Sequence, residues 1–291
     1  MDDPRLTPAR GDIAAKHLEG KVKADRFVEG EEFEIIDAVA PLRQGPSHDA
    51  SLDTEALKGE RVTIYDSNGE GWAWGQLNGD GYVGWLPDHA LVRPRMTPTH
   101  RVTALRTFAF PGPSIKAPPV EALPLGAAIE IVGTDGVFAI TPQRHYLPSQ
   151  HLCALDVFDS DFVGIAERFV GTPYLWGGKT ALGIDCSGLV QIALGACGMV
   201  VPRDSDLQQL VLGEELEEVE IDDLRRGDLI FWKGHVAIVR DAETLVHANA
   251  FHMAVAIEPI GEAHERILAS GTDIVSVRRL FEAPIDPAFI V

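Results

Sequence analysis

Apolar and polar positions alternate along several short stretches between residues 38 and 91, and turn-forming residues separate these stretches. The runs with this pattern are APLRQGPS, LKGERVTIYD, GWAWGQL and GYVGWLPDHAL. Alternation with a period of two, interrupted by Gly, Asn and Asp, is typical of short strands that close into a small barrel. The pattern therefore predicts an all-β barrel over residues 33–95.

A degraded copy of the same pattern follows the first. TALRTFAFPGPS corresponds to APLRQGPS, LPLGAAIEIV corresponds to LKGERVTIY, and YLPSQHL corresponds to WLPDHAL. An internal repeat with a period of about 60 residues indicates that one structural unit occurs twice. We therefore expect two small all-β barrels of the bacterial SH3-like type, with the second, degenerate one over residues 96–154.

The pattern changes over residues 155–291, where helical spacing and strand-like runs are mixed. Residues 161–170 and the residues after Asp185 have helical spacing, and Gly198 supplies a stop for the second of these helices. The run LRRGDLIFWKGHVAIVRDAETLVHANA predicts strands LIFW, HVAIV and LVHANA joined by tight polar turns. This last part is expected to be an α+β domain.

Residues 1–32 form a separate N-terminal segment with weaker signals. Residues 14–22 are weakly amphipathic, which predicts a short helix. The first residues, MDDPRLTPARGDIAAKHLEG, have an acidic start and no apolar core, which is not the pattern of a signal peptide. No apolar run reaches the roughly 18 residues that a membrane span needs. We therefore expect a cytoplasmic protein that has no membrane partner.

Cys186 is the residue with the clearest chemical potential. It stands between Asp185 and a Ser-Gly pair, where a loop gives way to the predicted helix. Asp185 is a suitable N-cap, which places Cys186 in the first helical turn. There the helix dipole favours a thiolate and the free N–H groups can hold an oxyanion. The small neighbours Ser187 and Gly188 are expected to leave room for a substrate backbone.

Neither of the other two cysteines shares this context. Cys197 lies among small residues of the same predicted helix, and Cys153 has no partner motif. Three cysteines without CxxC spacing argue against a disulfide framework and against a zinc site. We expect neither a metal nor a cofactor.

Two of the ten histidines lie within predicted strands downstream of Cys186. His235 opens HVAIV, and His247 lies in LVHANA on the next strand, so both can face the same side of a sheet. A nucleophilic thiol needs a nearby base, and a third group that fixes the tautomer of that base improves it. We assign His235 as the base and His247 as the residue that orients it, with Asn249 as the fallback for the third position.

Net charge limits the partners that the chain can bind. Formal charge at pH 7 is −19, from 25 basic and 44 acidic residues. Such a charge repels nucleic acid and anionic wall polymers, whereas a small peptide tolerates it. We expect no nucleic-acid partner, and the sequence leaves the oligomeric state open.

The last 135 residues or so contain, in order, the motifs GTPYLWGG, GIDCSGLVQ, PRDSDLQQ, RRGDLIFW, GHVAIV and LVHANA. Taken together, these motifs resemble those of the NlpC-type cell-wall peptidases, which have a papain-like fold. The resemblance implies cleavage of the amide between γ-D-glutamate and a diamino acid in peptidoglycan stem peptides. With two barrels in front, the whole chain resembles the three-domain subset of this family.

The resemblance also assigns roles to individual residues. It implies that Cys186 is the nucleophile, His235 the base and His247 the third member, and that the Tyr174 hydroxyl assists at the oxyanion. The positions that it implies along the substrate groove are Trp176, Asp185, Ser187 and Ser205. Arg203 and Gln208, in the RDSDLQ motif, are expected to have structural roles.

Similar three-domain proteins use the first barrel to close one end of the groove, so that only stem peptides with a free N-terminal L-alanine fit. Tyr82, in the GYVGW strand, resembles the barrel tyrosine with that role. The acid that would pair with the peptide ammonium stays open among Asp49, Asp53 and Glu55, which we expect in the loop between the first two strands.

The expected function is therefore cysteine-dependent hydrolysis of small stem peptides such as L-Ala-γ-D-Glu-diamino acid, in the recycling of cell-wall peptides. The alternatives are an endopeptidase on polymeric peptidoglycan, a non-catalytic module that binds wall peptides, and an amidase or acyltransferase on another γ-glutamyl compound. The sequence does not distinguish meso-diaminopimelate from lysine at the scissile bond, and it assigns no role to the second barrel.

Overall fold

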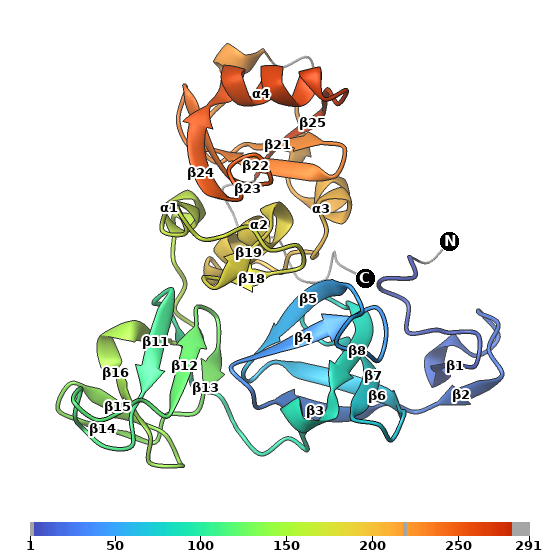
Figure 1. The fold of residues 1–291 in the computed structure, drawn as a ribbon, viewed down its shortest axis with the longest axis vertical. Coiled ribbons are helices and arrows are strands. Elements are labelled where there is room, and N and C mark those ends of the chain that lie inside the picture. Colours follow the sequence, from blue (N-terminus) through green and yellow to red (C-terminus); the bar gives the residue numbers. More distant parts are fainter. Residues whose placement is uncertain (1–2, 218–219, 281–291) are drawn as a thin grey trace. The chain divides into compact units, whose positions relative to one another are not determined.

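The computed structural model describes residues 3–217 and 220–280. The chain divides into two compact units, Met1–Val157 and Phe158–Val291. The first unit contains the predicted barrel region, and the second contains Cys186 and both histidines of interest (Figure 1).

The first barrel is a seven-stranded antiparallel sheet with the order β5-β4-β8-β7-β6-β3-β9. Its strands follow the alternating stretches of the sequence closely, and strands far apart in the sequence pair within it, β3 with β9 and β4 with β8. The strands are β3 (Glu31–Ile35), β4 (Val39–Arg43), β5 (Leu52–Leu57), β6 (Arg61–Ser67), β7 (Trp72–Leu77), β8 (Val83–Pro87) and β9 (Leu91–Val92).

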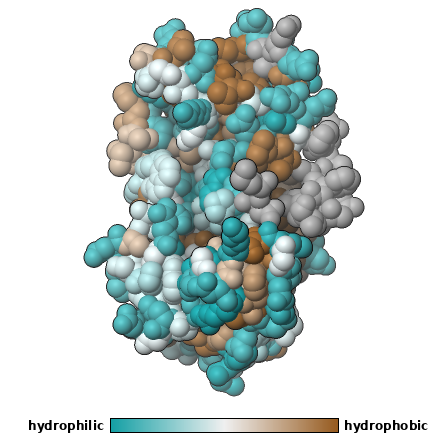
Figure 2. Space-filling view, turned by 90° about the vertical axis from the view of Figure 1, so that its right-hand side faces the viewer, coloured by the Kyte–Doolittle hydropathy of each residue, from teal (hydrophilic) through white to brown (hydrophobic). Residues whose placement is uncertain are grey.

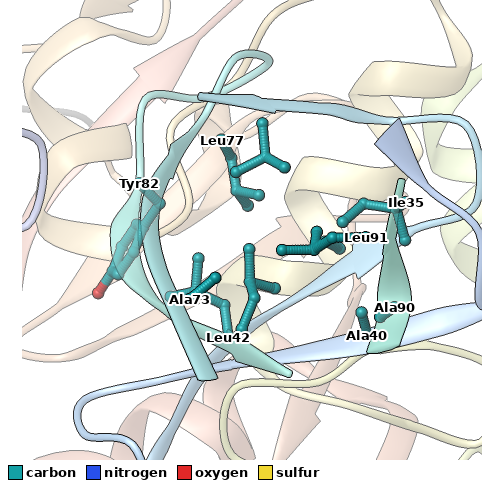
Figure 3. Packing of buried hydrophobic residues seen from close by; sticks show 11 residues of the cluster. Ile35, Ala40, Leu42, Ala73, Leu77, Tyr82, Ala90 and Leu91 are labelled. Carbon is teal, nitrogen blue, oxygen red and sulfur yellow. The ribbon is translucent and has the colours of Figure 1, made fainter. Parts of the chain in front are cut away.

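Alternate residues of these strands point inward and form the core of the barrel (Figure 3). Ile35, Leu42 and Leu86 are fully buried there. Tyr82, which precedes β8, belongs to the same cluster, and Figure 3 shows its hydroxyl pointing away from the other labelled side chains. Burial of such aliphatic side chains is the main force that stabilises a small barrel.

The prediction of a helix over residues 14–22 is wrong. Ile13–Ala15 instead forms β1, which pairs in parallel with β2 (Arg26–Val28), and only Lys16–Leu18 makes a 3₁₀ turn, η1. Three consecutive residues, 13 to 15, are fully buried, which a helix that packs through one face cannot achieve. The amphipathic pattern was too weak to outweigh this tertiary burial.

Arg10 shows what holds part of the N-terminal segment against the barrel. Its guanidinium lies over the rings of Trp74 and Trp85, at 4.6 and 4.8 Å from their centroids. The same group donates a hydrogen bond to Asp66 of β6. A cation that lies over two indoles and pairs with a carboxylate is a long-range contact that no local pattern reveals.

The rest of the first unit has three small antiparallel sheets with the orders β13-β10-β17, β11-β12 and β14-β15-β16. It has its own core, which includes Val102, Leu123, Ile129 and Leu147. The strands are β10 (His100–Val102), β11 (Arg106–Ala109), β12 (Glu121–Pro124), β13 (Ala128–Ile129), β14 (Gly133–Asp135), β15 (Phe138–Ile140), β16 (Tyr146–Pro148) and β17 (Leu152–Ala154).

Both copies of the repeat end in the same way. WLPDHAL folds as β8, a 3₁₀ turn η2 (Asp88–Ala90) and β9, and YLPSQHL folds as β16, the turn η3 (Ser149–His151) and β17. The common ending agrees with the sequence repeat. Assignment of the second copy to the SH3-like type stays a prediction.

The second unit is built on a six-stranded antiparallel sheet with the order β20-β25-β21-β22-β23-β24. The predicted strands LIFW, HVAIV and LVHANA are present as β21, β22 and β23. The strands of this sheet are β20 (Glu214–Glu215), β21 (Leu229–Trp232), β22 (His235–Val239), β23 (Thr244–Asn249), β24 (Ala254–Pro259) and β25 (Ile274–Arg279). A short hairpin of β18 (Lys179–Thr180) and β19 (Gly183–Ile184) lies outside the sheet.

Helices lie on both sides of this sheet (Figure 1). Helix α2 (Cys186–Ala196) packs on β22, on β23 and on α1 (Phe162–Glu167). Helix α4 (Ile260–Ala269) follows β24 and packs through Ile260 and Ala263 on the other side, in a core with Trp232 of β21. Two further elements are α3 (Ser205–Val211) and the 3₁₀ turn η4 (Ile221–Asp223).

The surface is mixed in character. Figure 2 shows hydrophilic residues over much of the displayed face, with apolar patches between them. Among the described residues, no helix combines the length and the apolar character needed to cross a membrane.

The core of the first barrel gives a test of the fold. Leu42 is fully buried, so we expect Leu42→Ala to lower the free energy of unfolding by about 3 kcal/mol, through lost burial and a residual cavity. Urea unfolding followed by tryptophan fluorescence measures this change, because Trp72, Trp74 and Trp85 belong to the barrel. Ile115→Ala, at a residue that is 75% exposed, is the control, and an equal loss in both variants would contradict the assigned core.

Candidate active site

A buried ion pair organises the start of α2. Asp185 is the N-cap residue, and its carboxylate accepts from the backbone N–H of Gly188 at 2.8 Å and from that of Gly177 at 2.7 Å. Arg203 donates to both carboxylate oxygens at 2.9 and 2.7 Å, and its side chain is almost fully buried. The Asp185 carboxylate therefore stabilises the first turn of α2, which contains Cys186, as the N-cap prediction implied.

Ser187 belongs to the same buried network. Its hydroxyl accepts from Arg203 at 2.9 Å and donates to Asp185 at 3.3 Å. Gln208 of α3 donates to the backbone carbonyls of Ser187 and Pro202, both at 2.9 Å. The predicted structural roles of Arg203 and Gln208 agree with these contacts, while contact of Asp185 and Ser187 with the substrate stays a prediction.

The space beside Gly188 is filled by protein backbone. A Cβ atom at this residue would lie 2.4 Å from the carbonyl oxygen of Gly178. The expectation that Gly188 leaves room for a substrate is therefore wrong. Its lack of a side chain lets the first turn of α2 approach the loop before β18 closely.

Cys186 is the first residue of α2, which packs on β22. The backbone N–H groups of Val236 and Ser187 favour the thiolate form of its side chain, and Val236 directly follows His235. Burial, followed by the nearby Asp185 charge, raises the pKa of the Cys186 thiol to about 12. Loss of solvation therefore outweighs the backbone N–H groups that favour a thiolate, and the direction of this shift is opposite to the one expected from the helix start.

The two histidines are joined as predicted. Nε2 of His235 lies 2.8 Å from Nδ1 of His247. Nε2 of His247 in turn lies 2.6 Å from the Glu258 carboxylate, to which Arg266 donates two further hydrogen bonds at 2.6 Å. We call this series, His235–His247–Glu258–Arg266, the histidine chain.

Electrostatics keep both rings of the histidine chain neutral. Burial is the largest cause and, with the neighbouring His247, lowers the pKa of His235 to about 3. Burial also lowers the pKa of His247, although Glu258 opposes this shift. Burial disfavours the Glu258 carboxylate, but the hydrogen bonds from His247 and Arg266 outweigh it and lower its pKa to about 2. A neutral imidazole can accept the thiol proton.

Tyr174 lies near the nucleophile on the loop that precedes β18. Its backbone N–H donates to the carbonyl of Met253 at 2.9 Å, which ties this loop to the start of β24. Burial, together with the charges of Cys186 and Asp185, raises the pKa of the Tyr174 hydroxyl well above its ordinary value. The hydroxyl therefore stays protonated and can donate a hydrogen bond to an oxyanion.

Two other predicted groove residues are accessible. Trp176 is 66% exposed, which excludes a role in the core of its unit. Gly177, which follows it, has a positive φ of 80°, so the chain turns sharply after the indole. Ser205 is the first residue of α3 and is partly exposed. Their contact with the substrate stays a prediction.

The predicted residues of the first barrel belong to the other unit. Tyr82 is buried in the barrel core, and its role in substrate selection stays a prediction. Of the three candidate acids, only Asp49 lies in the loop between β4 and β5. Placement of Asp53 and Glu55 in that loop is wrong, since pairing of β5 with β4 already begins at Leu52.

Glu258 and Arg266 are the residues that the sequence reasoning missed. The weak signal for Glu258 is one acidic residue within the apolar run AVAIEP, which directly follows the strand of His247. Asn249, the fallback for the third position, is not part of the histidine chain, because its side-chain oxygen accepts from the backbone N–H of His252 at 2.8 Å.

Among the described residues, His247, His252 and Glu258 are also close enough to be considered as metal ligands, with ligand atoms within 4.8 Å of one another. Both oxygens of Glu258, however, accept from Arg266, and one also contacts His247. A cation would compete with the guanidinium for the same carboxylate. We therefore interpret these residues as a hydrogen-bonded chain.

Two family models match the chain. The NlpC/P60 family matches residues 171–267, and the bacterial dipeptidyl-peptidase Sh3 domain matches residues 42–91. The first match covers Cys186 and the whole histidine chain, and the second covers most of the seven-stranded barrel.

Known proteins resemble the chain across both units. Dipeptidyl-peptidase 6 of Lysinibacillus sphaericus is 30% identical over 253 residues, which cover 79% of this chain and 92% of the relative. A gamma-D-glutamyl-L-lysine dipeptidyl-peptidase of Bacillus subtilis is 26% identical and covers 82% of this chain and 84% of its own length.

The crystal structure of an NlpC/P60 family protein from Bacillus cereus has the same fold, with a TM-score of 0.72, 21% identity, and coverage of 86% of this chain and 99% of that chain. The extent of the first relative's match, together with the family model over Cys186 and the histidine chain, shows that the chain belongs to the NlpC/P60 family.

Proposed function

We propose that this enzyme hydrolyses the amide bond between γ-D-glutamate and the diamino acid of peptidoglycan stem peptides. The preferred substrate in this proposal is a short peptide with a free N-terminal L-alanine, and the product is L-Ala-γ-D-Glu. The observation that carries the proposal is the histidine chain, which begins at His235, the residue before Val236, whose backbone N–H favours the Cys186 thiolate. The names of the similar proteins and of the matching Sh3 domain support the substrate class.

The acylation step follows from the site. Nε2 of His235 is bonded to His247, so Nδ1 is the nitrogen left to take the thiol proton. The sulfur of Cys186 then attacks the γ-glutamyl carbonyl carbon, and the carbonyl electron pair moves to oxygen. The Tyr174 hydroxyl and the backbone N–H of Cys186, at the start of α2, would stabilise that oxyanion.

The second half of the reaction uses the same groups. The imidazolium of His235 gives its proton to the amine of the diamino acid as the C–N bond breaks, which leaves a thioester on Cys186. His235 then takes a proton from water, the hydroxide attacks the thioester, and the sulfur leaves as a thiolate that recovers the proton. Glu258 stabilises the positive charge that forms transiently on the two histidines.

A role in recycling is part of the proposal. The net charge of −19 disfavours binding to anionic wall polymers, whereas it has little effect on a short peptide in solution. We propose that the enzyme acts in the cytoplasm on free stem peptides returned during wall turnover. Cleavage of polymeric peptidoglycan is the second candidate, and it predicts that peptides with a blocked N-terminus are cleaved as well.

The substrate prediction compares L-Ala-γ-D-Glu-meso-diaminopimelate, its lysine analogue and the N-acetylated form of each. We expect the free peptides to be cleaved and the acetylated ones to be poor substrates, because acetylation removes the ammonium charge. Chromatography of the released L-Ala-γ-D-Glu measures the rates, with Cys186→Ala as the inactive control. Equal cleavage of free and acetylated peptides would instead favour the endopeptidase.

Tyr174 gives a second test. We expect Tyr174→Phe to lower kcat about 100-fold with little change in KM, because one oxyanion donor is lost and binding groups stay in place. Tyr146→Phe, at a buried tyrosine of the first unit, is the matched control and should retain wild-type kinetics. A kcat for Tyr174→Phe equal to that of the wild type would remove the hydroxyl from the mechanism.

The raised pKa of the nucleophile leads to a third prediction. Because only the thiolate is alkylated, the rate of iodoacetamide modification of Cys186 should increase about tenfold per pH unit through the neutral range. Peptide mass spectrometry separates this site from Cys153 and Cys197, the other two cysteines of the sequence. A rate that is already at its plateau below pH 7 would show instead that a thiolate–imidazolium pair exists at rest.

A further inference from the structure

Glu258 is held from two directions. Arg266 of α4 donates from Nη1 to Oε2 and from Nη2 to Oε1, and His247 contacts Oε1 on the other side. The guanidinium also lies 4.4 Å from the centroid of the Phe251 ring, which fixes it further. These contacts keep the carboxylate ionised, so it has no proton to donate.

The ionised carboxylate determines where the hydrogens of the histidine chain lie. Because Glu258 can only accept, Nε2 of His247 must carry a hydrogen. A neutral imidazole has one N–H group, so Nδ1 of His247 is an acceptor and Nε2 of His235 must donate to it. The remaining nitrogen, Nδ1 of His235, then has the lone pair that a base needs.

The strand register makes this arrangement possible. Glu258 of β24 pairs with Leu245 of β23, so it is the diagonal neighbour of His247 on the same face of the sheet. Arg266 then reaches the carboxylate from α4, which directly follows β24. A cysteine, a base and a third residue can act together without further side chains, so Glu258 and Arg266 are additions to that set.

We propose that Glu258, held by Arg266, is a positioning residue that sets the tautomers of both histidines and so keeps Nδ1 of His235 free of hydrogen and able to accept the thiol proton. Its kinetic consequence rests on the proposed peptide hydrolysis. Without the carboxylate, the opposite tautomer of each ring forms the same hydrogen bond between the rings, but it puts an N–H on Nδ1 of His235, which cannot accept a proton.

Glu258→Gln removes the negative charge of the side chain and keeps its size and shape. Arg266 has only donors, so it should bind the carbonyl oxygen of the glutamine and turn the amide NH₂ toward His247. That NH₂ selects the inactive tautomer, so we expect kcat to fall at least about 100-fold while KM changes little. Adding Arg266→Gln should free the amide to rotate and recover part of the lost kcat.

Arg279→Gln is the matched control, because it breaks another bidentate arginine–carboxylate pair of the same sheet, with the buried Asp228, at 2.8 and 2.6 Å. Its kcat should equal that of the wild type. Wild-type kcat in Glu258→Gln, or a double variant that is no better than the single one, would overturn the proposal.

A second measurement needs no substrate. Long-range ¹H–¹⁵N NMR spectra of the histidine rings distinguish the two neutral tautomers, with His235→Asn and His247→Asn used for assignment. In the full-length wild type we expect both rings to carry the hydrogen on Nε2. Hydrogen on Nδ1 of either ring would overturn the tautomer assignment even if the peptide is cleaved, whereas expected tautomers without cleavage would overturn the proposed substrate alone.

Discussion

The catalytic unit depends on the buried ion pair between Asp185 and Arg203. One carboxylate caps α2, receives the Gly177 N–H from the preceding loop and neutralises an arginine that also bonds the Gly178 carbonyl. Removal of one partner from a buried pair typically costs roughly 3–5 kcal/mol, because the other charge is left without compensation. The first turn of α2, and with it the nucleophile, can hold its position only while this pair is intact.

Two ion pairs thus flank a reacting centre that is itself neutral. Asp185–Arg203 supports the thiol, and Glu258–Arg266 supports the base. Burial keeps the thiol protonated and the imidazoles uncharged at rest, so charge separates only as the reaction proceeds. The fixed charges near the site can then stabilise the transition state more than the resting state, which is the requirement for catalysis.

Much of the fold could be predicted, because the strands of the first barrel and of the β21–β23 region carry clear alternation and strong turns. The pairing of His235 with His247 could be predicted for a related reason: two polar side chains stand out in neighbouring apolar strands. The N-terminal strands could not, since burial of Ile13 and the stacking of Arg10 depend on residues far along the chain.

The same limit applies to the site. The sequence shows only that Cys186 stands at a helix start, whereas the desolvation of its side chain is a property of the folded unit. Glu258 becomes meaningful only once the register of β23 and β24 is known, because an isolated glutamate in an apolar strand has no chemical signature. Ion pairs such as Asp185–Arg203 join residues from separate motifs, and spacing alone does not reveal them.

The diagonal placement of His247 and Glu258 has a consequence for assembly. Side chains alternate between the two faces of a sheet, so a slip of one residue between β23 and β24 would move Glu258 to the opposite face and away from the imidazole. A misregistered molecule could retain its secondary structure and still lack the complete histidine chain. Enzyme activity is therefore a stricter test of correct strand pairing in this protein than any measurement of its β-strand content.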